Sequence, residues 1–327
     1  MLHGIKSAAL IALMALIGTS QTFAQSGAHS NYPNKPIRWV IPFAPGGGTD
    51  MVARPVAAKL TERLGQQILY DNRGGGGGVI AGEIVANANP DGYTLLAAAV
   101  AVMTVNVSLM KLPFDPVKDF APITKFANVP NMLAARTAFP VSKVQDVINY
   151  AKANPGKVRW ALSGTGSAGT LSMELLRLTT KIDVIPIPYK GAGPAMIGVL
   201  SGEADVMFAN PAVFMPHITG GRLRALATAS LQRTPALPEM PTFHESGFPN
   251  FESMSWYGLA APARTPAAII ALLHRETTAV LKLPDIIARI TQDGGFPVGN
   301  TPQAFAQEIR DDIAKWAKVI KDANIKM

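Results

Sequence analysis

Cysteine is absent from this chain of 327 residues, which excludes disulfide scaffolds, thiolate zinc sites, iron–sulfur clusters and cysteine nucleophiles. Long hydrophobic runs are also missing beyond the first 25 residues. The closest candidate, Leu95–Val105, is shorter than the roughly 18 apolar residues of a membrane-spanning helix. Charged residues make up only 16% of the chain and hydrophobic residues 48%. This balance excludes a disordered chain and predicts a buried core, in about two domains of roughly 150 residues each.

The chain is basic without any basic block. Its net charge is +8, from 30 Lys and Arg against 22 Asp and Glu. A basic balance is compatible with nucleic-acid binding, but the charges are dispersed, so no nucleic-acid partner is expected. Two weaker interpretations remain, attraction of anionic small molecules or no functional meaning. We favour the second.

The first residues follow the pattern of a secretory signal. Lys6 lies in a short basic start, Ala8–Ile17 is apolar, and Thr22-Phe23-Ala24 offers a small-x-small cleavage site. This core is too short to span a membrane, and no cysteine follows it for a lipid anchor. We therefore expect residues 1–24 to be a signal peptide and the mature protein to be soluble and periplasmic.

Two segments of the mature chain alternate between strand and helix patterns. The first has apolar strands at Ile37–Phe43, Gln67–Tyr70 and Tyr93–Ala97, with helices from Thr49-Asp50 to Leu64 and over Val79–Ala88. The second has strands at Val158–Leu162, Val184–Ile187 and Ala204–Phe208, with helices over Val144–Ala153, around Leu171–Leu178 and over Pro194–Leu200. This rhythm predicts parallel sheets covered by helices. The apolar spacing from Phe305 to Ile320 predicts a long final helix, and the Pro-rich stretch Pro235–Pro249 is expected to cross the surface.

Glycine-rich loops follow one strand of each segment. Gly164-Thr165-Gly166-Ser167-Ala168-Gly169 matches a dinucleotide pattern, but the acid that follows, Asp183, lies at the wrong end of its strand to reach a ribose. A phosphate-binding P-loop is excluded because Val158 follows the only Gly-Lys pair. We favour a joint interpretation: residues 45–50 and 163–167 each lead into a helix N-terminus, where free N–H groups attract anions. Taken singly, either loop is better explained as an ordinary β–α turn.

The sequence shows few of the residue combinations that are typical of catalytic sites. The histidines show no metal-binding spacing, and no Gly-x-Ser-x-Gly motif surrounds Ser163 or Ser167. Asp205 interrupts an apolar strand, so it must be near solvent, paired, or directed into a site. Lys190 is either a turn cation or a cleft residue. No metal or cofactor is expected.

Several blocks together resemble the substrate-binding proteins of tripartite tricarboxylate transporters, the Bug/TctC family. They cover nearly the whole mature chain in order: Tyr32–Arg38, Pro42–Asp50, Asp71-Asn72-Arg73 with its glycine run, Asn89–Thr94, Pro188–Gly191, Gly202–Phe208, Leu237–Thr242, and Trp256-Tyr257-Gly258 near Ala261-Pro262. The resemblance implies an α/β fold of two domains with a cleft between them, the type II or Venus-flytrap periplasmic binding fold. Domain 1 would comprise residues 25–125 and 229–327, and domain 2 residues 126–228.

The resemblance also implies a ligand and a site. The family's carboxylate ligand is held, partly through waters, by the loops matching Phe43–Asp50 and Ser163–Ser167. Ala98–Thr104 replaces a stretch often rich in Ser and Thr, which favours an aromatic or aliphatic carboxylate over citrate. The expected binding residues are Phe43, Ala44, Gly46, Gly47, Gly48, Thr49, Asp50, Ala99, Ser163, Gly164, Thr165, Gly166, Ser167, Lys190 and Asp205.

These features predict a monomeric solute-binding protein without enzymatic activity. It would capture a di-, tri- or aromatic carboxylate and present it to membrane transporter subunits or to a sensor. Closure of the cleft would exclude water around the ligand. The alternative is an exported α/β enzyme acting on a small carboxylate, which turnover of the bound acid would reveal.

Overall fold

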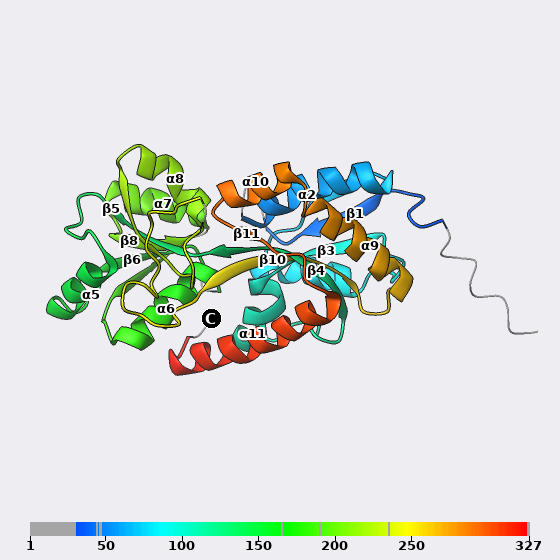
Figure 1. The fold of residues 1–327 in the computed structure, drawn as a ribbon. Coiled ribbons are helices and arrows are strands. Elements are labelled where there is room, and N and C mark those ends of the chain that lie inside the picture. Colours follow the sequence, from blue (N-terminus) through cyan, green and yellow to red (C-terminus); the bar gives the residue numbers. More distant parts are fainter. Residues whose placement is uncertain are drawn as a thin grey trace, which may run out of the picture.

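The computed structural model describes residues 31–325 apart from 44, 46, 47, 165, 190 and 235. The expected signal peptide and the site residues Ala44, Gly46, Gly47, Thr165 and Lys190 lie outside the described residues. The described chain forms two lobes, each built on its own sheet (Figure 1).

The first lobe holds a six-stranded mixed sheet in the order β11-β4-β10-β3-β1-β2. Its strands are β1 (Ile37–Ile41), β2 (Ile68–Asn72), β3 (Thr94–Ala99), β4 (Phe120–Pro130), β10 (Met254–Pro262) and β11 (Phe296–Pro297). β1 pairs in parallel with β2 and β3, whereas β10 lies antiparallel between β3 and β4. The parallel arrangement predicted for the three strands of this unit is confirmed for β1, β2 and β3. The unpredicted strands β10 and β11 run in the opposite direction, and β4 runs in the same direction as β3.

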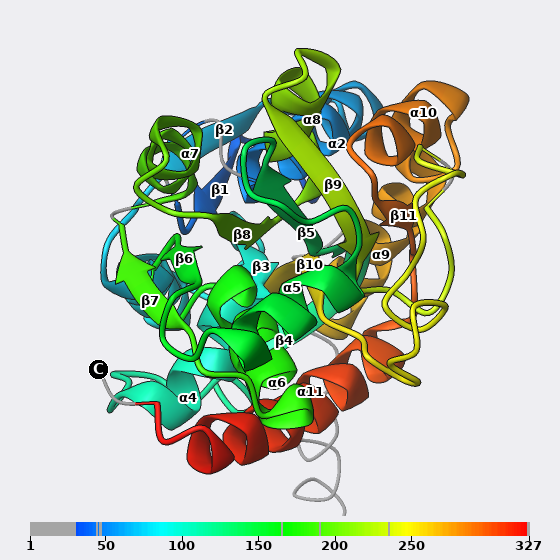
Figure 2. The same cartoon turned by 90° about the vertical axis from the view of Figure 1, so that its left-hand side faces the viewer.

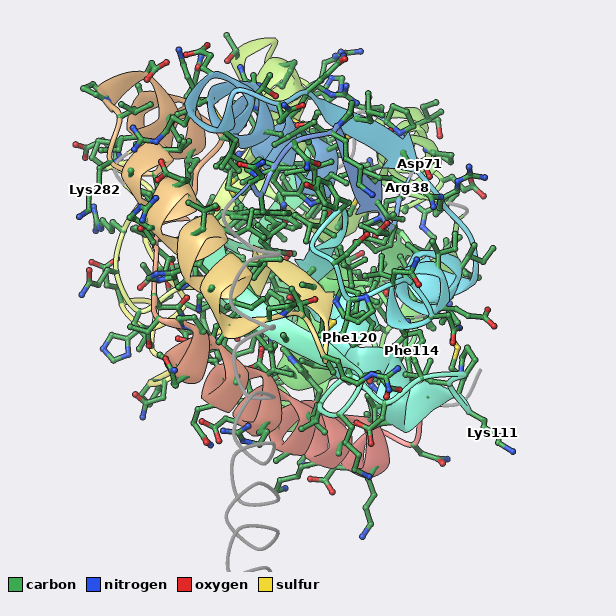
Figure 3. All side chains as sticks on the ribbon, turned by 90° about the vertical axis from the view of Figure 1, so that its right-hand side faces the viewer. Arg38, Asp71, Lys111, Phe114, Phe120 and Lys282 are labelled. Carbon is green, nitrogen blue, oxygen red and sulfur yellow. The ribbon has the colours of Figure 1, made fainter. Side chains whose placement is uncertain are left out.

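Helices cover both faces of this sheet. They are α2 (Gly48–Leu64), α3 (Val79–Ala86), α4 (Asn106–Leu109), α9 (Ala267–Val280), α10 (Pro284–Gln292) and α11 (Pro302–Asp322), with short turns η1 (Gly76–Gly78) and η2 (Ala101–Val105). Figure 3 shows two of the lobe's side-chain pairs. Arg38 Nε lies 2.7 Å from Asp71 Oδ2 across β1 and β2, and the rings of Phe114 and Phe120 meet edge to face at 5.5 Å.

The second lobe holds a five-stranded mixed sheet in the order β7-β6-β8-β5-β9. Its strands are β5 (Met132–Arg136), β6 (Arg159–Leu162), β7 (Ile185–Pro188), β8 (Val206–Ala209) and β9 (Leu223–Thr228), and its helices are α5 (Val144–Ala153), α6 (Ala168–Thr180), α7 (Ala192–Ser201) and α8 (Pro211–Thr219). β6 is parallel to β7 and β8, but β5 runs antiparallel to β8 and β9. The three strands predicted in this segment correspond to β6, β7 and β8 and are parallel, as expected. β5 and β9 were not predicted.

The chain crosses between the lobes at segments that are hydrogen-bonded to one another. It first crosses at Asn131, because β4 remains paired in the first sheet as far as Pro130. The predicted boundary after residue 125 therefore lies inside β4. Asn131 N donates to Ser253 O at 3.1 Å, Ala229 N donates to Asn131 O at 2.7 Å, and Ser253 N donates to Ala229 O at 2.9 Å. These hydrogen bonds hold the outgoing and returning segments together.

The returning segment is not a simple surface crossing. Phe243 and Phe251 are buried in the core of the second lobe, with Phe248 packed against it. The chain thus stays with the second lobe beyond the predicted boundary at residue 229, and the Pro-rich stretch contributes apolar side chains to that core.

The final helix also contacts both lobes. Trp316 and Val319 of α11 share one apolar cluster with Leu171 of α6, and the two helices lie side by side in Figure 2. Arg177 Nη2 of α6 donates to Ala323 O, just beyond α11, at 3.3 Å. The apolar stripe predicted for this helix therefore packs partly on the opposite lobe.

Candidate functional site

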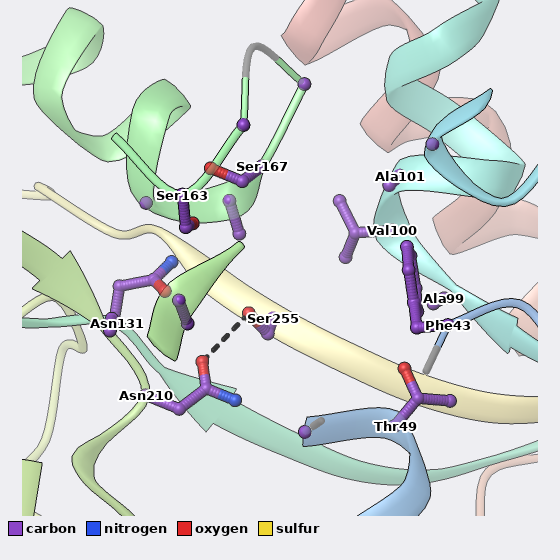
Figure 4. Close-up of a pocket in the computed structure, with 18 of the residues that line it drawn as sticks. Phe43, Thr49, Ala99, Val100, Ala101, Asn131, Ser163, Ser167, Asn210 and Ser255 are labelled. Carbon is purple, nitrogen blue, oxygen red and sulfur yellow. Dashed lines mark hydrogen bonds between the residues drawn. The ribbon is translucent and has the colours of Figure 1, made fainter. Parts of the chain in front are cut away.

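A cavity of about 480 Å³ opens between the lobes (Figure 4). Residues of both lobes line it, and those of the first lobe include part of β10. The lining residues are Phe43, Gly48, Thr49, Gly77, Ala99, Val100, Ala101, Asn106, Met110, Asn131, Ser163, Gly164, Gly166, Ser167, Ala168, Gly169, Tyr189, Gly191, Ala192, Phe208, Ala209, Asn210, Val213, Ser255, Trp256 and Tyr257. Its volume lies within the ~300–1,000 Å³ usual for small-molecule sites.

The second lobe contributes the loop between β6 and α6. Ser167 caps α6, because its Oγ accepts a hydrogen bond from Thr170 N at 3.2 Å. Thr170 Oγ1 in turn donates to Gly164 O at 2.7 Å. At Gly169 an added Cβ would lie 2.4 Å from Phe208 O, so only glycine lets α6 approach β8 this closely. The loop is thus held by its own hydroxyl groups, with a helix N-terminus facing the cavity wall.

The first lobe contributes the start of α2. Phe43, Gly48 and Thr49, which the sequence predicts to be ligand-binding residues, line the cavity. Asp50 does not line it. Its carboxylate accepts from the guanidinium of Arg54 at 2.6 Å and is buried in the first turn of the helix. The prediction of Asp50 as a cavity residue therefore differs from the structure, because this side chain turns along its own helix.

One wall of the cavity is apolar. Ala99, Val100, Ala101 and Met110 form part of it, where β3 passes into η2. Trp256 also contributes. Its indole Nε1 donates to Asp312 Oδ2 of α11 at 2.6 Å, and its ring meets Phe305 edge to face at 5.2 Å. Burial raises the pKa of Asp312 despite this hydrogen bond.

Polar side chains that the sequence interpretation missed lie between the two loops. Ser255 Oγ lies 3.2 Å from Asn210 Oδ1, and Asn210 Nδ2 lies 2.8 Å from the Tyr257 hydroxyl oxygen. Burial raises the pKa of Tyr257, so its hydroxyl stays neutral. A signal for Asn210 was available, because it directly follows a strand parallel to its neighbour β6, and ligands gather at the carboxyl ends of such strands.

Asp205 lies outside the cavity, contrary to its predicted binding role. Its Oδ1 accepts from Arg136 Nε at 2.9 Å and from Arg159 Nη2 at 2.8 Å, and its Oδ2 accepts from Arg159 N at 3.0 Å. Burial alone would raise the pKa of Asp205, but the hydrogen bonds from Arg159 and Arg136 outweigh it and hold the pKa below its usual value. Of the three environments that the sequence left open, the structure places Asp205 in the paired one.

Charge is scarce at this site. No Asp, Glu, Lys or Arg occurs among the described residues that line the cavity. Across the described part of the chain, no three His, Asp or Glu side chains gather as a metal site would require. No helix within that part combines the length and apolar character needed to cross a bilayer.

Comparisons with known proteins place the chain among relatives of one kind. The profile of the "Tripartite tricarboxylate transporter family receptor" matches residues 52–325. Protein BugT of Bordetella pertussis is 35% identical, with 97% of this chain and 98% of BugT aligned.

Two solved structures are also similar. Rpa4515 of R. palustris with adipate is 34% identical over 90% of this chain and 99% of that chain, with a TM-score of 0.85. MatC from Rhodopseudomonas palustris with bound malate is 34% identical over 88% of this chain and 100% of that chain, with a TM-score of 0.79.

Proposed function

Because this chain belongs to the tripartite tricarboxylate transporter receptors, a family of periplasmic substrate-binding proteins, we propose that it captures a small carboxylated metabolite between its lobes. The family and the two-lobed α/β fold predicted from the sequence are confirmed. The loaded protein would then dock on a membrane transporter or a sensor. Export to the periplasm would be directed by residues 1–24 and followed by cleavage after Ala24.

One observation carries the proposal. The N-terminal ends of α2 and α6, one from each lobe, border the same cavity, and none of its described lining residues is Asp, Glu, Lys or Arg. Helix N-termini attract anions through free N–H groups and the positive end of the helix dipole. The adipate and malate bound by the two related structures support this ligand class.

Capture would proceed without covalent chemistry. The chain crosses between the lobes at the hydrogen-bonded segments around Asn131, Ala229 and Ser253, and a rotation between the lobes would occur there. Closure around the acid would displace water and lower the local dielectric constant, which strengthens each N–H···O contact.

A thermal-shift screen tests the ligand class. The protein is first unfolded in guanidinium and refolded, so that no co-purified acid fills the cavity. It is then heated with adipate, malate, citrate, benzoate and nicotinate, and with ATP and NAD as controls. A ligand at 100 times its Kd adds about 2.7 kcal/mol, which raises the Tm by several degrees. A rise with an acid supports the proposal, whereas a rise with nucleotides alone, or with none of these compounds, contradicts it.

Export is tested separately. Amino-terminal sequencing of the protein from a periplasmic extract should begin at Gln25. A mature protein that retains residues 1–24 would contradict this part of the proposal.

A further inference from the structure

Three side chains form a hydrogen-bonded chain across the cleft. Ser255 and Tyr257 lie on β10 of the first sheet, and Asn210 follows β8 of the second. The two contacts are 3.2 Å between Ser255 Oγ and Asn210 Oδ1, drawn dashed in Figure 4, and 2.8 Å between Asn210 Nδ2 and the Tyr257 hydroxyl. All three residues line the cavity. A polar network therefore joins the lobes at the site where ligand would lie.

The two hydroxyl groups of this network also hydrogen-bond to each other. As placed, the Ser255 hydroxyl donates to Asn210 Oδ1 and Asn210 Nδ2 donates to the Tyr257 oxygen, which leaves the Tyr257 proton unused in both bonds. If the carboxamide is turned over, Tyr257 donates to Asn210 and the Ser255 proton is left instead. In either orientation the remaining proton lies between the two hydroxyl groups, because the Tyr257 and Ser255 side chains also hydrogen-bond to each other.

Two features of the surrounding structure accommodate this network. Asn210 occupies the N-cap of α8, where an asparagine side chain usually accepts from the first turn, but here it makes no capping bond. Gly48 at the start of α2 packs so closely that an added Cβ would lie 2.3 Å from the Tyr257 hydroxyl and 2.8 Å from Asn210 Nδ2. Two lobes and a helix N-terminus thus converge on the same hydroxyl–amide pair.

We propose that Ser255, Asn210 and Tyr257 form an interlobe latch, and that the hydroxyl proton shared by Ser255 and Tyr257 turns to an oxygen of the bound ligand. The latch holds the lobes together and recognises a hydrogen-bond acceptor, such as a carboxylate, hydroxyl or carbonyl oxygen. This inference rests on the proposed function for the ligand, but the contact between lobes can be tested without one.

The ligand-free test is a double-mutant cycle in urea. Asn210→Ala, Tyr257→Phe and the combined variant are unfolded in parallel with the unmodified protein. If the two side chains interact, the combined loss of stability is smaller than the sum of the single losses. Strict additivity would overturn the latch.

The ligand test uses calorimetric titration with adipate and malate. We expect Tyr257→Phe to weaken binding tenfold or more, and Ser255→Ala to weaken it by a smaller factor if Tyr257 supplies the proton. The reverse ranking assigns the proton to Ser255. The matched control is Tyr70→Phe, because the Tyr70 hydroxyl also makes a 2.8 Å bond, to Ala53 O, but lies outside the cavity; its affinity should stay unchanged.

The possible failures differ in what they overturn. Unchanged affinity in both Tyr257→Phe and Ser255→Ala overturns the recognition of ligand by the latch while leaving the proposed function intact. If neither acid binds the unmodified protein but another acid of the thermal-shift screen does, that acid replaces them in the titration. If no acid binds, the proposed function and the ligand half of this inference both fail, and the cycle still decides the contact between lobes.

Discussion

The two ends of β8 carry polar residues with opposite uses. Asp205, before the strand, is charged, buried and bound by two guanidinium groups. Asn210, after the strand, is neutral, lines the cavity and reaches across to the other lobe. Only four residues separate them, from Val206 to Ala209.

The difference follows from the direction of the strand. β8 and β6 run in parallel, and the carboxyl ends of such strands open toward the ligand crevice. An acid at the opposite end meets the neighbouring strands' side chains instead, here Arg136 of β5 and Arg159 of β6. Position along the strand therefore decides whether a polar residue stabilises the lobe or faces the ligand.

The largest expected effect comes from neutralising the buried end. Asp205→Asn should lower the free energy of unfolding by about 2–3 kcal/mol, because it leaves two guanidinium groups without their carboxylate. The value lies below the usual range for buried pairs because the Arg136 and Arg159 side chains are 25% and 37% exposed. Urea unfolding measures the loss. Asp183→Asn, at an exposed position of the same lobe, should change stability by no more than about 0.5 kcal/mol.

The ligand affinity of Asp205→Asn separates a structural role of this residue from a binding role. Because Asp205 lies outside the cavity, Asp205→Asn should bind the acid identified in the thermal-shift screen with unchanged Kd. A tenfold loss of affinity would instead restore the binding role that the sequence suggested for this residue.

The second effect comes from placing charge at the ligand end. Asn210→Asp should weaken carboxylate binding by about tenfold or more, or at least about 1.4 kcal/mol, since like charges would face each other in the cavity. Calorimetry measures the change. Asn149→Asp is the matched control, because Asn149 is exposed on α5 and lies outside the cavity. Equal losses in both variants would point to net charge rather than position.

The third effect is a difference in acid sensitivity. The folded pKa of Asp205 is lowered from 3.8, so its stabilising contribution is complete above the unfolded pKa and is lost as pH falls through the folded pKa. Below about pH 3.8, the unmodified protein should therefore lose up to about 1.4 kcal/mol per pH unit more than Asp205→Asn. Parallel urea titrations from pH 5 to pH 2.5 measure the slopes, and identical slopes would contradict this role for the carboxylate.

The smallest effect concerns the cavity wall. Asp312→Asn keeps an acceptor for the Trp256 indole but removes its charge, so the hydrogen bond should weaken by about 1 kcal/mol. We expect carboxylate affinity to fall by less than tenfold. Trp256 is the single tryptophan among the described lining residues, so quenching of its fluorescence on titration reports both its position and binding. An unchanged spectrum and affinity would show that Asp312 does not position the indole.

Much of the fold was readable from local patterns. The helix predicted over Val144–Ala153 has the same bounds in the structure, because its apolar positions repeat with helical spacing. β4 and β10 gave no such signal. β10 is buried along nearly its whole length, so it lacks the alternation that marks a strand with one exposed face. The parallel pattern predicted for the neighbouring units holds for β1–β3 and for β6–β8.

The site was readable in part for the same reason. Glycine-rich loops before helices mark Gly48, Thr49, Ser163, Gly164, Gly166 and Ser167, and all of them line the cavity. The cross-cleft network left no local signal, because Asn210 and Ser255 are ordinary polar residues separated by 45 positions.

The sequence by itself determined the family, the alternating α/β units, and the two glycine loops that lead into helices. These depend on neighbouring residues, whose spacing and backbone freedom act within one turn or strand. The tertiary structure decided which polar side chains face the cavity, the pairing of Asp205 with Arg136 and Arg159, and the contact of Asn210 with Tyr257. Those outcomes depend on strand direction and on the approach of two lobes, and distant residues meet only when the chain has crossed between its sheets and returned.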